Sequence, residues 1–376
     1  MDKEQALPRA NEAAHDLWSQ IFERAIAGPN AALHDPTYDE EHGSAAILAK
    51  ALRDAGWSED QINARAAVIA SREPASHTTS PGVGQGLEQQ LREIADRVRS
   101  AMSAMGYSSH EMVVLGIDPK VGVSAYLTNV IMTDEGIVSV SSFLFRWCGL
   151  IARAYLRTLL LDVHHWSEAP PNADKDKTIL LNRPDLAFYW FRIFVSFTTI
   201  GTHVLAPFRP STPFEVVHFE QVAWAMEFYA VSHEYAHHAL GHRSSFANHK
   251  DQEFEADALA MKVCERLEFE PFSFASNPYA RTGAAATLTL RALTILRGFE
   301  HRVIGSGAER DTHPLVAERI SRIVNRHVLN PNQFKMDRNF NDTVVRIMDA
   351  VEALSIEFLE RGGTDLLKKM KERTSV

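Results

Sequence analysis

Cysteine is scarce in this sequence, and so is positive charge. Only Cys148 and Cys264 occur among the 376 residues, far apart and in no CxxC pattern. This excludes a disulfide framework or a cysteine-rich zinc module as the organising principle, and we expect Cys264 to be a small core residue. The 48 acidic residues outnumber the 39 basic ones and give a formal net charge of −9. A nucleic-acid-binding surface needs a basic face, so we expect no nucleic-acid partner.

A secretory signal and long uncharged apolar runs are also lacking. No apolar run follows the charges of the first ten residues, MDKEQALPRA, which predicts a cytoplasmic, reducing compartment. Residues 143–161 are apolar but carry three arginines, and residues 186–208 contain Arg192 and His203. A charge in mid-span costs about 2.5–3.5 kcal/mol on insertion scales. We therefore expect both stretches to be buried helices, and a membrane-associated protein is the alternative.

The first 85 residues have the pattern of short helices followed by a loop. The stretch SAAILAKALRDAG has apolar positions at helical spacing, and Ser58 with Gln61 forms a capping-box pattern that would start a second helix. Residues 72–86 are rich in Pro, Ser, Thr and Gly. We expect residues 1–85 to form a helical amino-terminal region with a linker, and residues 86–376 to form the second domain.

Short β-branched runs occupy residues 111–142 and give way to helical patterns from Phe143 onward. The runs are EMVVLGI, VSAYLTNVIM and GIVSVSS, and the turn signature TDEG separates the last two. The sequence therefore predicts an α+β fold that is mostly helical, with a small β-sheet before the histidine-containing helix. His164 and His165 belong to no motif, and we expect them in a solvated loop.

The segment VSHEYAHHALGH carries the pattern of a metal site. Residues four apart lie on one helix face, so His233 and His237 can direct two imidazoles at one ion, at the roughly 2.0–2.1 Å that zinc requires. Glu234 is adjacent, where its carboxylate can take a proton from a zinc-activated water. A catalytic zinc site uses three protein ligands and leaves the fourth position open, so a third ligand must come from elsewhere.

Glu253 is the third ligand that we predict. A metzincin would need His at position 243, where this chain has Arg243, and an ideal helix would turn His242 about 140° away from His237. Glu253 and Asp257 form a second pair four apart. Glu253 can supply a carboxylate from a neighbouring helix, and Asp257 can accept the other ring N–H of a ligating histidine.

One simpler interpretation stands beside the metal site. The histidines could be uncharged, buried and hydrogen-bonded within an apolar helix, although the separate Glu–Asp pair favours the metal. Glu255 is out of phase with Glu253 by about 200° on an ideal helix, so we expect it to face away and not to bind the ion.

HEYAHHALGH together with EFEADALA resembles the gluzincin metallopeptidases of the CAAX prenyl protease and HtpX type. In that family HExxH is commonly followed by a histidine matching His242, and an ExxAD motif matching residues 253–257 supplies the third ligand. DTHPLVAERI is similar to the family's late histidine–proline motif, matching His313 and Arg319. The resemblance spans residues 112–322 and implies a zincin-like metallopeptidase domain. Only fifteen residues separate His237 from Glu253, a shorter spacing that is similar to the ImmA/IrrE-type soluble metallopeptidases.

His313 and Arg319 each allow two interpretations. His313 could donate a hydrogen bond to the oxyanion of the tetrahedral intermediate, or THP could simply cap the next helix, with Thr312 as the cap and Pro314 in the first turn. Arg319 could pair with an acid near the site, or it could be a surface arginine.

The sequence thus predicts a zinc-dependent endopeptidase with one Zn²⁺ per chain. His233, His237 and Glu253 would bind the ion, and Glu234 would act as general base and then pass the proton to the leaving amine. Residues 136–142 would form the sheet edge that pairs with an extended polypeptide substrate. The alternative is a non-catalytic, zinc-stabilised scaffold or partner-binding protein.

Overall fold

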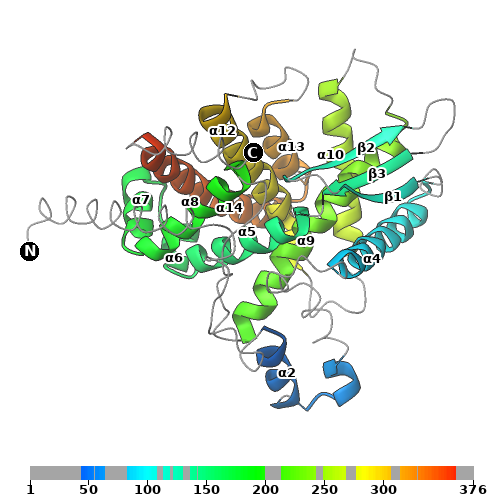
Figure 1. The fold of residues 1–376 in the computed structure, drawn as a ribbon, viewed down its shortest axis with the longest axis horizontal. Helices are drawn as coiled ribbons and strands as arrows, with labels where there is room; N and C mark the ends of the chain where they lie inside the picture. Colours follow the sequence, from blue (N-terminus) through cyan, green and yellow to red (C-terminus); the bar gives the residue numbers. More distant parts are fainter. Residues whose placement is uncertain are drawn as a thin grey trace, which may run out of the picture.

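The computed structural model describes most of the chain from residue 44 to residue 360. Within these residues the protein is mostly helical with one three-stranded sheet (Figure 1), which confirms the predicted α+β class. The expected domain boundary near residue 85 stays a prediction, because most of the predicted linker lies outside the described residues. The described ranges are 44–54, 56–63, 83–107, 113–118, 122–129, 136–141, 143–199, 213–242, 249–267, 277–305, 314–327 and 329–360.

The three β-branched runs form the sheet, which lies at one end of the molecule (Figure 1). Strand β3 (Gly136–Ser141) is central, with β1 (Val113–Asp118) parallel to it on one side and β2 (Ala125–Asn129) antiparallel on the other. The predicted TDEG turn falls mainly on residues that the structure does not describe. Helix α4 (Val83–Ala104) packs beside β1.

The prediction that residues 136–142 form the sheet edge is wrong. Both sides of β3 are occupied, because Val138 pairs with Leu115 on β1 and with Leu127 on β2. The alternating burial of β3 fits either position, so the sequence pattern could not distinguish a central strand from an edge strand. The edge strand beside the histidine-containing helix is β2.

Helix α9 (Pro213–Ala239) runs through the centre of the molecule (Figure 1). Pro213 occupies its first position, where the missing N–H costs nothing, and no glycine or further proline interrupts it. Helices α5 (Leu144–Leu159), α10 (His249–Leu267) and α12 (Ala284–Ile304) pack around it. Its apolar side chains are buried on nearly every side, as expected for a core helix. The fully buried ones include Val216, Val222, Met226, Val231, Tyr235 and Ala236.

The two apolar stretches form buried helices as far as the structure describes them. The first is α5, in which the guanidinium of Arg153 lies 4.6 Å from the centre of the Phe219 ring. The second is α8 (Pro184–Thr199), whose aromatic side chains pack into the core. Among the described helices, none combines the length and apolar character that crossing a bilayer requires.

The amino-terminal capping box is confirmed, whereas the expectation for His165 is wrong. The backbone N–H of Ser58 donates to the Gln61 side chain at 3.2 Å, and that of Gln61 donates to the Ser58 hydroxyl at 3.4 Å. His165 is buried in α6 (Val163–Glu168), with Nε2 only 2.6 Å from Oδ1 of Asp176. Asp176 belongs to the next helix, and Arg346, 2.8 Å from the same ring nitrogen, lies 181 residues away, so the local sequence carried no sign of this cluster. His164 is exposed, as expected, but it lies in α6 and not in a loop.

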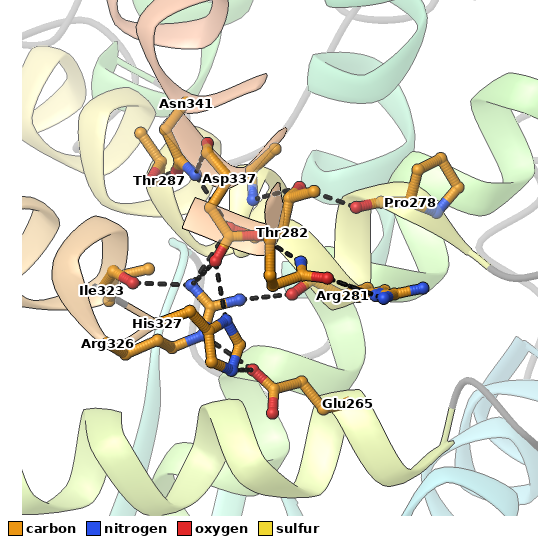
Figure 2. A network of polar contacts seen from close by, with 12 residues as sticks. Glu265, Pro278, Arg281, Thr282, Thr287, Ile323, Arg326, His327, Asp337 and Asn341 are labelled. Atoms are coloured by element: carbon orange, nitrogen blue, oxygen red, sulfur yellow. Dashed lines mark hydrogen bonds and ion pairs between the residues drawn. The ribbon is translucent and has the colours of Figure 1, made fainter. Parts of the chain in front are cut away.

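A partly buried polar network fixes the carboxyl-terminal helices relative to one another (Figure 2). Arg326, at the end of α13 (Val316–Asn325), donates to the carbonyls of Arg281, Thr282 and Ile323, and to Glu265 Oε1 of α10 at 2.7 Å. Asp337 of α14 (Pro331–Phe358) lies 3.4 Å from Arg326 Nη1 and 2.8 Å from His327 Nδ1. The network therefore sets how α13 lies against α10.

Candidate metal centre and cleft

Helices α9 and α10 bring three metal-binding side chains together. His233 Nε2 lies 3.1 Å from His237 Nε2, and the Glu253 carboxylate oxygens lie 3.4 Å from His233 Nε2 and 3.5 Å from His237 Nε2. A tetrahedral zinc ion with bonds of roughly 2.0–2.1 Å needs ligand atoms about 3.3–3.4 Å apart. The two imidazole nitrogens and the two oxygens of the Glu253 carboxylate are spaced about as such an ion requires. One donor atom from each side chain lies within 4.8 Å of the others, so this cluster could hold a metal.

Asp257 and Arg319 contact the side chains of this cluster. Asp257 Oδ1 lies 3.0 Å from Nδ1 of His233, a short contact at which the ring N–H is not aimed straight at the oxygen. Arg319 donates to both Asp257 oxygens at 2.7 Å and lies 3.1 Å from Glu253 Oε2. Arg319 is 8% exposed, so the structure places it among the acids of the site and not at the surface.

The charges around His233 favour a positive charge between the carboxylates. Burial acts to lower the pKa of His233, but its contacts with Asp257 and Glu253 raise it to about 10. Burial likewise acts to raise the pKa of Asp257, but Arg319 and His233 hold it at about 2. The pKa of Glu253 is held far below its usual range by both histidines and by Arg319, against the effect of burial. A metal ion would replace the ring proton, since binding a metal releases protons from its ligands.

Glu234 lies in the same cleft, opposite strand β2. Burial raises the pKa of its carboxyl, and the two neighbouring histidines act to lower it. The backbone of Leu127 on β2 forms a hydrogen bond with this carboxylate. The acid is therefore held between the metal-binding cluster and the edge of the sheet.

Tyr229 and the pair formed by His242 and Glu255 also contact the cluster, and sequence reasoning missed these contacts. The Tyr229 hydroxyl donates to Asp257 at 2.6 Å. Tyr229 lies one turn before His233 on the same helix face, and this spacing could have indicated from the sequence that Tyr229 lies near the site. His242 Nδ1 lies 2.9 Å from His237 Nδ1, so the expectation that His242 turns away from His237 is wrong. That expectation assumed a continuous helix, whereas the helix ends before His242 and the backbone turns back toward the site. Glu255 is outside the group of metal donors but contacts His242 at 3.0 Å.

The cluster opens into a cleft of about 500 Å³. Strand β2 and the residues before it line one part of the cleft, and helix α12 lines another part through Thr289, Leu290, Leu293 and Arg297. Leu290 and Leu293 make that part apolar, while Arg297 is paired with Glu300 at 2.6 Å. No sequence signal indicated α12, because its residues are distant from both motifs along the chain.

His313 and Thr312 lie outside the described residues, so the proposed roles of both stay predictions. Pro314 is described, and the expectation that it sits in the first helical turn is wrong. Helix α13 begins at Val316 with Leu315 at its N-cap position, so Pro314 precedes the helix. Leu315 offers no side-chain oxygen, and the cap carries no side-chain hydrogen bond.

Comparison with known proteins gives one family. Residues 154–338, slightly less than half of the chain, match the model of the family described as Peptidase U49. The matched segment includes both histidines of HExxH, the ExxAD residues and Arg319, and leaves out the sheet. No curated protein and no solved structure matches the chain. The family match supports a peptidase function, and therefore a polypeptide substrate.

Proposed function

We propose that this protein is a zinc-dependent endopeptidase of the gluzincin type. The observation that carries the proposal is the triangle of donor atoms from His233, His237 and Glu253. Two imidazole nitrogens and one carboxylate oxygen form a donor set that suits zinc, and all three side chains line the cleft. The match to a peptidase family gives independent support.

The residues around the cluster have separate roles in this proposal. A bound zinc ion would polarise the scissile carbonyl and make water a better nucleophile at neutral pH. His233, His237 and Glu253 would hold the ion, while Asp257 orients the His233 ring and Arg319 keeps the two carboxylates in place. Holding a ligand in one orientation preserves the geometry that the reaction needs.

Glu234 would carry the proton between the reacting groups. It would accept a proton from the attacking water and then deliver it to the leaving amine. Its raised pKa suits this double role, because a base whose pKa lies nearer to neutrality also releases its proton more readily. His313 could add a hydrogen bond to the developing oxyanion.

Strand β2 is suited to bind the substrate backbone. The Ser141 N–H donates to the Ser124 carbonyl at 2.8 Å, so the alternation of an antiparallel pair turns the backbone groups of Ala125 and Leu127 away from β3. Leu127 contacts Glu234 on that side, and Ala125 also lines the cleft. An extended peptide could add to this edge as a further strand.

Zinc analysis and one substitution test the proposal. Purified protein should contain about one zinc ion per chain, because the described residues include one set of three ligands. Glu234→Gln should keep the ion and lose proteolysis, as measured by neo-termini in a proteome digested with each protein. If Glu234→Gln cleaves as much as the wild type, the proposal that this protein is the peptidase is refuted, and the zinc-stabilised scaffold becomes the favoured interpretation.

A further inference from the structure

Helix α9 ends in a backbone motif that involves the second histidine of HExxH. The Gly241 N–H donates to the His238 carbonyl at 3.0 Å, and the His242 N–H donates to the His237 carbonyl at 2.9 Å. Gly241 has φ of 67°, in the left-handed region. These two bonds and the left-handed glycine define a Schellman motif, with Gly241 directly after the helix cap and His242 next.

A Schellman motif often brings the side chain after the glycine against the side chain five residues earlier. That pair is commonly apolar, but here it consists of His242 and His237, with 2.9 Å between the two Nδ1 atoms. His242 is buried, and its Nε2 lies 3.0 Å from Oε2 of Glu255 on α10. The three side chains form a continuous row from the metal-binding cluster to the surface, where the Glu255 side chain is 64% exposed.

The distances allow one arrangement of ring protons if His237 binds a metal. Its Nε2 must then be free of hydrogen, so its Nδ1 carries the proton and donates to Nδ1 of His242. The remaining ring proton of His242 is on Nε2, where it faces the Glu255 carboxylate. Each contact in the row then has one donor and one acceptor.

We infer that His242 is a positioning residue for the metal ligand His237, with Glu255 as the terminal acceptor. This inference rests on the proposed function, because it assigns His237 to the ion. The two histidine ligands are then supported differently. The buried carboxylate of Asp257 contacts His233 directly, whereas the row through His242 ends in solvent.

Zinc affinity of the full-length protein tests the role of His242. The affinity would be measured by competition with a chromophoric chelator, for the wild type and for His242→Phe and His242→Gln. The helix cap uses the backbone of residue 242, so both variants retain it. His242→Phe should weaken zinc binding about 10–100-fold, the range typical of lost support for a ligand. His242→Gln should recover most of the affinity, because its amide can accept from His237 and donate to Glu255.

Glu255→Ala tests the outer end of the row. We expect it to weaken zinc binding by less than about tenfold, because solvent can replace an exposed carboxylate. Asp251→Ala is the matched control, since Asp251 is another exposed acid on α10, and it should leave the affinity unchanged. The visible spectrum of the Co²⁺-loaded protein should change in His242→Phe and not in Asp251→Ala.

The outcomes separate this inference from the proposed function. Wild-type zinc affinity and an unchanged Co²⁺ spectrum in His242→Phe would overturn the inference about His242. The proposed peptidase function would still be supported in that case if Glu234→Gln loses cleavage. Equal loss of affinity in His242→Phe and His242→Gln, together with a lowered unfolding temperature of both zinc-free proteins, would show a merely structural role and also overturn it. Absence of zinc binding by the wild type would remove the proposed function itself.

Discussion

At the scale of single residues, Arg319 joins the two acids that the metal site depends on. Its guanidinium contacts both oxygens of Asp257 and one oxygen of Glu253, and all three side chains are buried. Burying two carboxylates side by side is unfavourable unless a cation lies between them. Arg319 therefore makes it possible to bury the Glu253 and Asp257 carboxylates side by side, and it also holds them in position.

Substitution of Arg319 should destabilise the protein strongly. Arg319→Leu should lower the free energy of unfolding of the zinc-free protein by about 3–5 kcal/mol, because it leaves buried carboxylates without their partner. Arg319→Lys keeps the charge but loses the two-pronged contact, so its effect should be smaller. Urea unfolding measures both, and Arg322→Lys, at an exposed position of the same helix, is the control. Equal stability of Arg319→Leu and wild type would contradict this account.

At the scale of elements, the sheet must approach α9 closely for β2 to border the cleft. A Cβ atom added at Gly136 on β3 would lie 2.8 Å from Nδ1 of His238 on α9 and 2.9 Å from Cδ1 of Leu127 on β2. Both distances are too short for an unchanged structure. The absence of a side chain at this position therefore lets the sheet and the helix meet.

Gly136→Ala should disturb both the sheet and the site. We expect a loss of about 1–3 kcal/mol in the free energy of unfolding, the usual effect of overpacking a core. Gly116→Ala on β1 is the matched control, because its added Cβ would meet neighbours no closer than 3.6 Å. Thermal unfolding of the two variants should differ clearly. If both retain wild-type stability, the close approach at Gly136 is not required.

Strand β2 provides a second prediction at this scale. Ala125→Pro removes an N–H that points away from β3, so the ladder between β2 and β3 should persist. Loss of one hydrogen bond worth about 0.5–1.5 kcal/mol should reduce kcat/KM on a peptide substrate several-fold, with zinc content unchanged. Unaltered kcat/KM in a folded Ala125→Pro protein would argue against strand addition at this edge.

At the scale of the whole molecule, a second buried ion cluster connects helices α6, α7 (Ala173–Leu181) and α14. Arg346 of α14 donates to both oxygens of Asp176 on α7, at 2.7 and 2.6 Å, and to the His165 carbonyl at 2.7 Å. Burial acts to raise the pKa of Asp176, but the hydrogen bonds from Arg346 and His165 lower it below its usual value. The cluster holds α6 and α7 against α14.

The lowered pKa of Asp176 makes this connection dependent on pH. A carboxyl whose pKa is lower in the folded state stabilises the fold above its unfolded value near 3.8, and that stability is lost as pH falls through the folded value. Arg346→Met leaves the buried Asp176 with His165 but without its arginine partner, and should raise the pH of acid unfolding, followed by circular dichroism. Arg338→Met on the same helix removes only an exposed pair and should not. The same acid midpoint in both variants would contradict the prediction.

The sequence by itself determined the features that local backbone geometry controls. Helical periodicity sets residues four apart on one face, which is why His233 and His237 could be placed together, as could Glu253 and Asp257. The β-branched runs predicted the three strands. Each of these depends on residues within about one or two helical turns.

The tertiary structure decided everything that joins distant segments. Strand order placed β3 in the centre and β2 at the edge, because pairing depends on the packing of the whole sheet against α9 and not on the alternation within one strand. The partners of Arg319, the contact between His165 and Arg346, and the α12 side of the cleft likewise come from segments far away in sequence. A buried charge must find an opposite charge wherever the folded core brings one, and local periodicity cannot specify which segment supplies it.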